Sequence, residues 1–269
     1  MRADPDAAAS RDADHSPQPA HPPEPASEPA IHLQHPTAQN RPRRATSPSD
    51  PVLIASQTLA LPVDQTTLLG ELELPPQASG LVVFGHCSSG SSRLSSRNRH
   101  LSRLLQQADL GSFSVDLRTP AETQLPALPQ LTHRLVAVCG WLHRQPELFG
   151  MRLGLLGEGS AAAVSLEAAG QLGPAVGALV ALGGEHNAPA RPWSQLLAPT
   201  LLVVGGQAAS TSPLARQQQA HQATGAPSTL HVVPQAGPTF QEPGTLAQAA
   251  AQAAAWFNCY LAKPSAARG

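Results

Sequence analysis

Two hydrophobic periods alternate along most of the chain. In residues 67–74, Gly70, Leu72 and Leu74 alternate with Glu71 and Glu73, a period of two that predicts a half-buried strand near a sheet edge. Residues 81–84 form a continuous apolar run, as in a buried parallel strand, and residues 101–108 then repeat apolar positions at helical spacing. The alternation continues, and it predicts strands at 112–116, 152–156, 175–182, 200–204 and 230–233 and helices at 131–142, 160–169, 213–223 and 245–261.

Strands that alternate with helices predict an α/β fold with a mainly parallel, doubly wound sheet covered on both faces. The strand at 67–74 would be an antiparallel strand at its edge. Ligands of such sheets sit beyond the carboxyl ends of the strands. The loops to examine are therefore those that follow the predicted parallel strands.

The first 50 residues have a different composition. They contain no Phe, Trp or Tyr and carry ten of the 28 prolines. Such a segment cannot bury enough apolar surface to offset its ordering entropy, so residues 1–50 are predicted to be a disordered arm. The prediction leaves one domain at 51–262 and a short tail at 263–269.

Charge and cysteine usage narrow the function classes. The formal net charge of -1 argues against a nucleic-acid-binding protein, and no run of 18 apolar residues predicts a membrane span. The three cysteines lie far apart, which fits a reducing compartment, and the start of the chain lacks an apolar signal sequence, so a cytoplasmic location is expected. The histidines have no metal-ligand spacing, and no metal or cofactor is expected.

Residues 152–166 hold the most informative motif. An apolar strand, a tight turn and an Ala-rich helix start follow one another, which is the layout of the G-x-S-x-G nucleophile elbow. Here the five positions read Gly157-Glu158-Gly159-Ser160-Ala161. The nucleophile position is Gly159, which has no side chain.

A second run, Gly90-Ser-Ser-Arg-Leu-Ser-Ser-Arg-Asn-Arg99, follows the first buried strand. It is similar to the G-S-S-R-x-S-x-R-N-R run of some α/β-hydrolases, and residues 55–262 resemble the dienelactone-hydrolase-like branch of that fold. Further matches are 198–206 and 240–244. The resemblance implies a Ser/Asp/His triad in that chain order. Its three positions fall on Gly159, Gln207 and Pro238, so no catalytic residue is assigned and a pseudoenzyme is expected.

Other residues could line the pocket or replace the lost chemistry. Ser160 is the fallback nucleophile, although a helix-capping role is the simpler interpretation. The arginines of the Gly90–Arg99 run could bind an anion. A solvated helix face and structural ion pairs are the simpler explanation for them. Asp116 is expected to organise neighbouring loops by accepting backbone N–H bonds. The pocket candidates are His86, Cys87, Ser88, Ser160 and His186, and the anion-binding candidates are Arg93, Arg97 and Arg99.

Three functions remain open. The first is a catalytically inactive α/β-hydrolase-like protein that binds a protein partner through the arm or the pocket face. The second is an active hydrolase of small esters or lactones with a displaced nucleophile. The third is a sensor that keeps the pocket and binds a small molecule.

Overall fold

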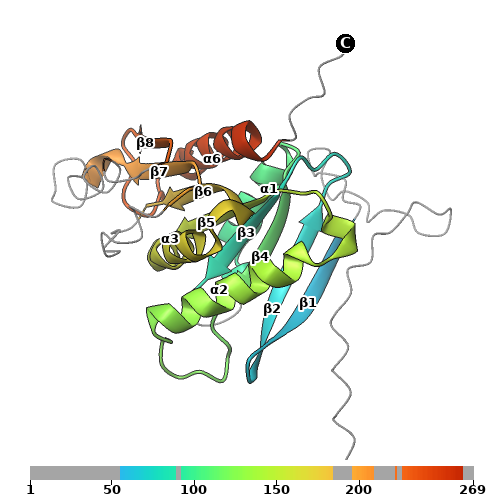
Figure 1. The fold of residues 1–269 in the computed structure, drawn as a ribbon. Coiled ribbons are helices and arrows are strands. Elements are labelled where there is room, and N and C mark those ends of the chain that lie inside the picture. Colours follow the sequence, from blue (N-terminus) through green and yellow to red (C-terminus); the bar gives the residue numbers. More distant parts are fainter. Residues whose placement is uncertain (1–54, 89–91, 184–195, 209–221, 223–225, 263–269) are drawn as a thin grey trace, which may run out of the picture.

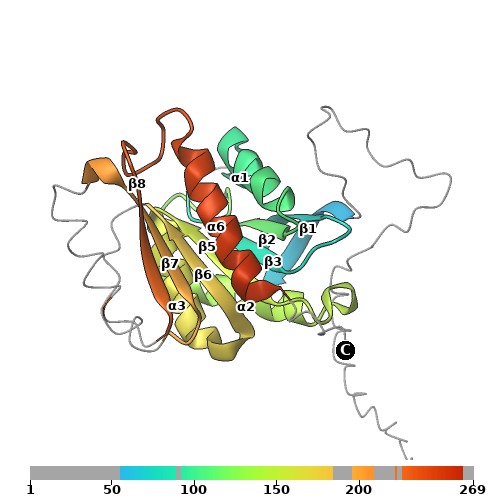
Figure 2. The same ribbon diagram turned by 90° about the horizontal axis from the view of Figure 1, so that it is seen from above.

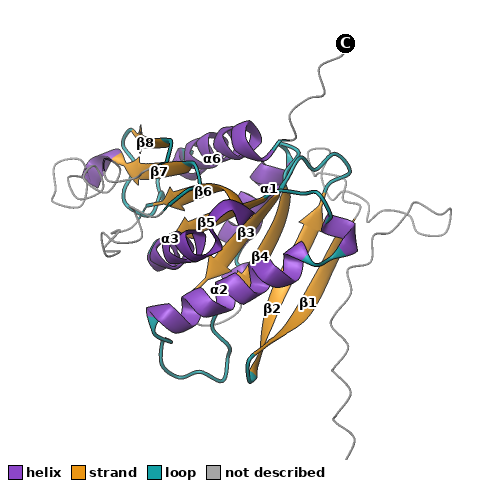
Figure 3. Ribbon diagram, viewed as in Figure 1, coloured by secondary structure: helices purple, strands orange, loops and turns teal. Residues whose placement is uncertain are grey.

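The computed structural model describes residues 55–88, 92–183, 196–208, 222 and 226–262. Within these ranges the chain forms an eight-stranded sheet with helices on both sides (Figures 1 and 3). The strands are β1 Ala55–Val63, β2 Thr66–Leu74, β3 Leu81–His86, β4 Gly111–Asp116, β5 Leu153–Glu158, β6 Val176–Leu182, β7 Thr200–Gly205 and β8 Ser228–Val233. The helices are α1 Ser96–Gln106, α2 Leu128–His143, α3 Ser160–Leu172 and α6 Thr245–Leu261, with short 3-10 turns η1 Ser92–Leu94, η2 Pro146–Leu148, η3 Gly173–Ala175 and η4 Gly206–Ala208.

The strand order is β1-β2-β4-β3-β5-β6-β7-β8. β1 and β2 pair antiparallel, β2 joins β4 antiparallel, and all further neighbours are parallel. The expected fold, a mainly parallel α/β sheet with antiparallel pairing at one edge, is confirmed. The predicted edge position of the strand at 67–74 is wrong: this strand is β2, and β1 lies outside it. The carboxyl ends of β3, β5, β6, β7 and β8 therefore lie side by side at one end of the strands, which we call the carboxyl edge of the sheet.

Helices cover the two faces of the sheet in pairs. α2 and α3 lie on one face and α1 and α6 on the other (Figure 2). Each face has its own apolar core: Val83, Leu155 and Leu202 belong to the first, and Val82 and Leu156 to the second. The inner strands are apolar on both faces for this reason, because no side of a buried parallel strand meets water.

Strand β1 was not predicted, because its polar residues Ser56, Gln57 and Thr58 interrupt the apolar run at the sheet edge. The predicted arm, the tail and almost all of the predicted helix at 213–223 lie outside the described residues. None of the helices in the described ranges is both long and apolar enough to cross a bilayer.

Candidate functional site

The turn between β5 and α3 has the backbone shape of a nucleophile elbow. Gly159 adopts φ +57° and ψ −121°, a region that L side chains rarely enter, and its N–H donates to Leu182 O at 3.2 Å. A Cβ on Gly157 would approach Ala161 O to 2.6 Å, so only glycine allows this close crossing of strand and helix. A Cβ on Gly159 would meet nothing within 4 Å. The elbow keeps room for a side chain and has none.

Gln207 lies in η4, directly after β7. Its backbone N–H donates to Ala236 O at 2.9 Å, and its side-chain amide donates to Gln235 O at 2.7 Å. The side chain therefore ties η4 to the loop after β8. A carboxylate could not make the second bond, because an ionised acid only accepts hydrogen bonds.

Pro238 is exposed in the loop after β8. That loop lies directly against the ends of the neighbouring strands: a Cβ on Gly183 would come within 2.1 Å of Pro238 O, and one on Gly205 within 2.2 Å of Gly237 O. The Glu242 carboxylate accepts the Gly237 N–H at 2.9 Å, and this bond lowers the pKa of Glu242. The structure thus brings the positions that follow β5, β7 and β8 to one edge of the sheet.

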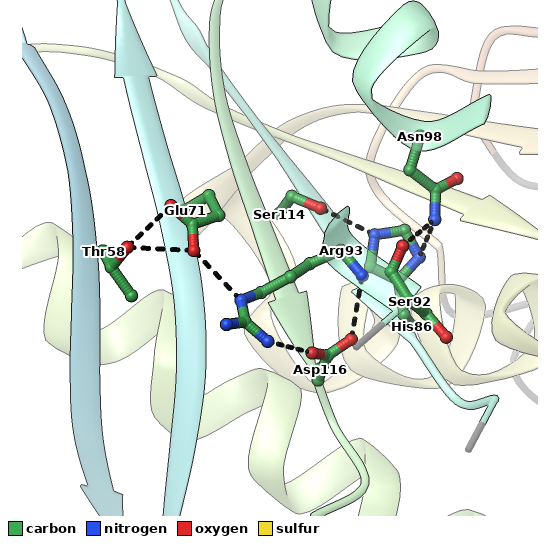
Figure 4. Close-up of polar contacts among 8 residues, drawn as sticks. All are labelled: Thr58, Glu71, His86, Ser92, Arg93, Asn98, Ser114 and Asp116. Atoms are coloured by element: carbon green, nitrogen blue, oxygen red, sulfur yellow. Dashed lines mark hydrogen bonds and ion pairs between the residues drawn. The ribbon is translucent and has the colours of Figure 1, made fainter. Parts of the chain in front are cut away.

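His86 ends β3 at the same edge and is held on both ring nitrogens (Figure 4). The Asn98 amide nitrogen donates to Ser92 O at 2.7 Å and faces His86 Nδ1 at 3.3 Å, so Nδ1 is the acceptor and Nε2–H donates to Ser114 Oγ at 2.7 Å. Burial lowers the pKa of His86 to about 4, against a smaller opposing effect of Asp116. The imidazole is neutral at pH 7 and its nitrogens are occupied.

Arg93 is buried, with 8% of its side chain exposed, and it joins two carboxylates. Its Nη1 donates to Asp116 Oδ2 at 2.6 Å and its Nε to Glu71 Oε1 at 3.1 Å, while Thr58 bonds the same glutamate (Figure 4). Asp116 Oδ1 also accepts the Arg93 backbone N–H at 3.0 Å, which confirms the predicted loop-organising role of Asp116.

These contacts correct the proposed anion patch. Arg93 is engaged by two carboxylates of the chain, and Arg97 forms an ion pair with Glu158 of the elbow, with Nε 2.9 Å from Oε1. Arg99 alone of the three points to solvent without a carboxylate partner among the described residues. The structural ion pairs that the sequence left as the simpler explanation account for Arg93 and Arg97.

The remaining pocket candidates separate in space. Cys87 is buried in the core on the α2–α3 face, and burial raises the pKa of its thiol to about 11. Ser88 is exposed, and His186 lies outside the described residues. Ser160 is exposed at the start of α3, where Gly159 is the cap residue and no side-chain cap bond forms, so the expected capping role of Ser160 is wrong.

Comparison with known proteins places this geometry in a family. The chain is 32% identical to a dienelactone hydrolase from Anabaena variabilis, with a TM-score of 0.72 over 77% of this chain and 98% of that one. The chain belongs to the dienelactone hydrolase-like family. An α/β serine hydrolase from Xanthomonas campestris has the same fold at 19% identity, with a TM-score of 0.62 over 78% of this chain and 97% of that one. No family model matches the chain.

Two curated proteins from Mycobacterium tuberculosis strains are also similar. Each carries the name "Putative phosphoribosyl transferase" and is 37% identical over 212 residues, which are 77% of this chain. Those residues make up 46% of each relative, so the chain spans about half the length of the curated relatives that it matches.

Sequence reasoning missed two residues that shape the site of this dienelactone hydrolase-like chain. Asn98 fixes the ring of His86, and Ser95 caps α1 by accepting the Asn98 N–H at 3.2 Å. Both lie within the Gly90–Arg99 run, which was used for the family resemblance and in which roles were considered only for the arginines. Their contacts show that the described part of this run holds the loop after β3 in place.

Proposed function

We propose that this chain is a catalytically inactive member of the dienelactone hydrolase-like family and acts by binding. One observation carries the proposal. The elbow keeps its backbone shape and its open space, but Gly159, Gln207 and Pro238 occupy the positions that the resemblance gives to nucleophile, acid and base. A triad whose members are all replaced retains only the residual catalysis of oxyanion hole and binding.

The neighbouring groups support this proposal because none is ready to take over. A thiol with a pKa of about 11 is almost entirely protonated at pH 7, so Cys87 is a poor nucleophile there. His86 is neutral, but both of its ring nitrogens are engaged by Asn98 and Ser114. Ser160 is exposed without a hydrogen-bonded base among the described residues. A serine hydroxyl without a base is a weak nucleophile.

The binding function is proposed for the carboxyl edge of the sheet or for the N-terminal arm. A protein partner could recognise the Pro-rich residues 1–50, and a small molecule could occupy the space over Gly159. Capture of a protein partner by the full chain but not by a chain that starts at Pro51 would assign binding to the arm. Equal capture by both would assign it to the carboxyl edge. The transferase activity in the names of the mycobacterial relatives stays with those proteins, because the match covers less than half of their length.

The test of inactivity is turnover of a short-chain nitrophenyl ester, with fluorophosphonate and iodoacetamide labelling read by mass. We expect no turnover above a heat-denatured control and no fluorophosphonate adduct. Turnover that is lost in Ser160→Ala or in Cys87→Ala would establish the alternative, an active ester or lactone hydrolase with a displaced nucleophile. Ser88→Ala is the matched control, since Ser88 is an exposed hydroxyl outside the elbow.

Restoring the chemistry is the complementary test. Gly159→Ser alone should remain inactive, because no base follows it at position 238. Gly159→Ser with Pro238→His and either Gln207→Asp or Ala208→Asp supplies all three groups. Gln207→Asp also removes the bond to Gln235 O, so Ala208→Asp, which keeps that bond, should give the better rescue.

A further inference from the structure

Strand β8 forms one edge of the sheet in the part of the chain that the structure describes. It is the last strand in the order and pairs along one side with β7 (Figures 1 and 2). Of its six residues, Val233 alone is buried, and Val232 is 39% exposed. Proteins usually protect such an edge with a charged residue, a proline or a bulge. The strand reads Ser-Thr-Leu-His-Val-Val and its register with β7 is regular, so it carries none of the three.

The hydrogen bonds fix which residues of β8 face outward. Thr200 N–H donates to Pro227 O at 2.9 Å, and Thr200 lies opposite Ser228. In a parallel pair, the residues that direct their N–H and C=O to the neighbour alternate along each strand. The backbone groups of Thr229 and His231 therefore point to β7, and those of Leu230 and Val232 point away from it. No contact among the described residues uses these outward groups.

We propose that the β8 edge pairs with the β8 edge of a second copy of this chain, antiparallel about a two-fold axis that passes beside His231. In this register Leu230 of each copy faces Val232 of the other, and each such pair exchanges two N–H···O bonds. His231 faces His231 of the other copy. The pairing joins the two sheets into one and satisfies all four outward backbone groups of each copy's Leu230 and Val232.

The chemistry of the edge favours a second copy as its occupant. A two-fold contact brings identical residues together, and a strand without Lys, Arg, Asp or Glu brings no like formal charges together. The facing Leu230 and Val232 form an apolar cross-strand pair twice. Leu230 already packs against the core beneath α2 and α3, so the pair extends that apolar face across the junction.

The opposite edge of the sheet differs. Strand β1 buries Ala55, Leu59, Leu61 and Val63 beneath the helices and exposes only the small Ala60 among its non-proline apolar residues. It also carries Pro62, which lacks an N–H to donate. Its exposed positions alternate with these buried ones. Among the described residues, therefore, the edge strand that exposes a large apolar side chain is β8, and β1 provides the site of a control substitution.

Sedimentation or light scattering of the full chain from micromolar to millimolar concentration tests the proposal. A standard protein interface buries about 1,600 Å², and one strand pairing buries less, so we expect a monomer–dimer equilibrium at the upper concentrations. Val232→Lys should raise the dissociation constant of the dimer at least tenfold, and Ala60→Lys on β1 should leave this constant unchanged. A monomer at every concentration, or a dimer that Val232→Lys does not weaken, would overturn the proposal.

A cysteine scan tests the register. In a Cys259→Ser background, which removes the exposed native thiol, His231→Cys should form a disulfide-linked dimer on mild oxidation, because facing residues of a non-hydrogen-bonded pair have Cα atoms about 4.5 Å apart. Thr229→Cys is the matched control: its counterpart would lie four residues away along the strand, about 13 Å, too far for a disulfide. Equal crosslinking of the two variants, or none of His231→Cys, would exclude this register and with it the proposed contact.

Discussion

The neutral His86 at the end of β3 makes the stability of the domain depend on pH. Burial lowers the pKa of His86 from 6.5 to about 4, while the ring accepts from Asn98 and donates to Ser114. The unfolded chain therefore binds a proton at His86 that the folded chain does not. Stability is complete above the unfolded pKa of 6.5 and falls as the pH decreases from 6.5 to 4.

The magnitude follows from the same two values. A shift of this size corresponds to about 3 kcal/mol in total, of which about 2 kcal/mol is lost between about pH 7 and 5. His86 is half-buried, and solvent screening weakens the effect of its ionisation, so both free energies are upper limits. The Glu122 carboxylate, whose pKa is lowered to about 2 mainly by its hydrogen bond from Arg134, loses its contribution only as the pH falls below its ordinary 4.5. The interval between pH 5 and 6.5 therefore separates the effect of His86 from that of Glu122.

The assay is urea unfolding at a series of pH values for the wild type and for His86→Gln, whose side-chain amide can still donate to Ser114. The variant should lose the part of the pH dependence that comes from His86. The unfolding free energy of the wild type should therefore fall by about 2 kcal/mol relative to that of the variant from pH 7 to 5. His100→Gln, at an exposed histidine of α1, is the control and should keep the wild-type slope. Parallel curves for wild type and His86→Gln would refute the reasoning, as would an NMR titration midpoint of His86 near 6.5.

Three further predictions concern the elbow glycines, the buried arginine and the cysteines. Gly157→Ala should cost roughly 2–3 kcal/mol of unfolding free energy, because its Cβ meets the α3 backbone at 2.6 Å. Gly159→Ala has open space around its Cβ but a φ of +57°, and it should cost about 1 kcal/mol. Equal losses of the two variants in urea unfolding would contradict this. Arg93→Met should cost about 3 kcal/mol or more, because it leaves Asp116 buried without its cation, and the exposed Arg99→Met should stay within about 0.5 kcal/mol. Iodoacetamide should modify the exposed Cys259 in the folded protein and spare Cys87, as read by peptide mass; early modification of Cys87 would contradict its burial.

The sequence by itself determined the fold class and the elbow. Continuous apolar runs at 81–84 and 201–204 are typical of elements buried on all sides, and their alternation with helical periods predicts a parallel sheet. Local spacing also identified the β5–α3 turn and the end of β4 at Asp116. These features depend on residues close in sequence, which is why pattern alone could predict them.

Tertiary structure decided what the polar residues do. Glu71, Arg93 and Asp116 are far apart in sequence, and only the adjacency of β2 and β4 places two carboxylates around one guanidinium. Burial turned Cys87 from a possible nucleophile into a protonated core thiol, and the bond from Gln207 to Gln235 O ties two loops together across 28 residues of sequence. Burial, ionisation and hydrogen-bond partners depend on contacts between distant segments, so residue types and spacing cannot fix them.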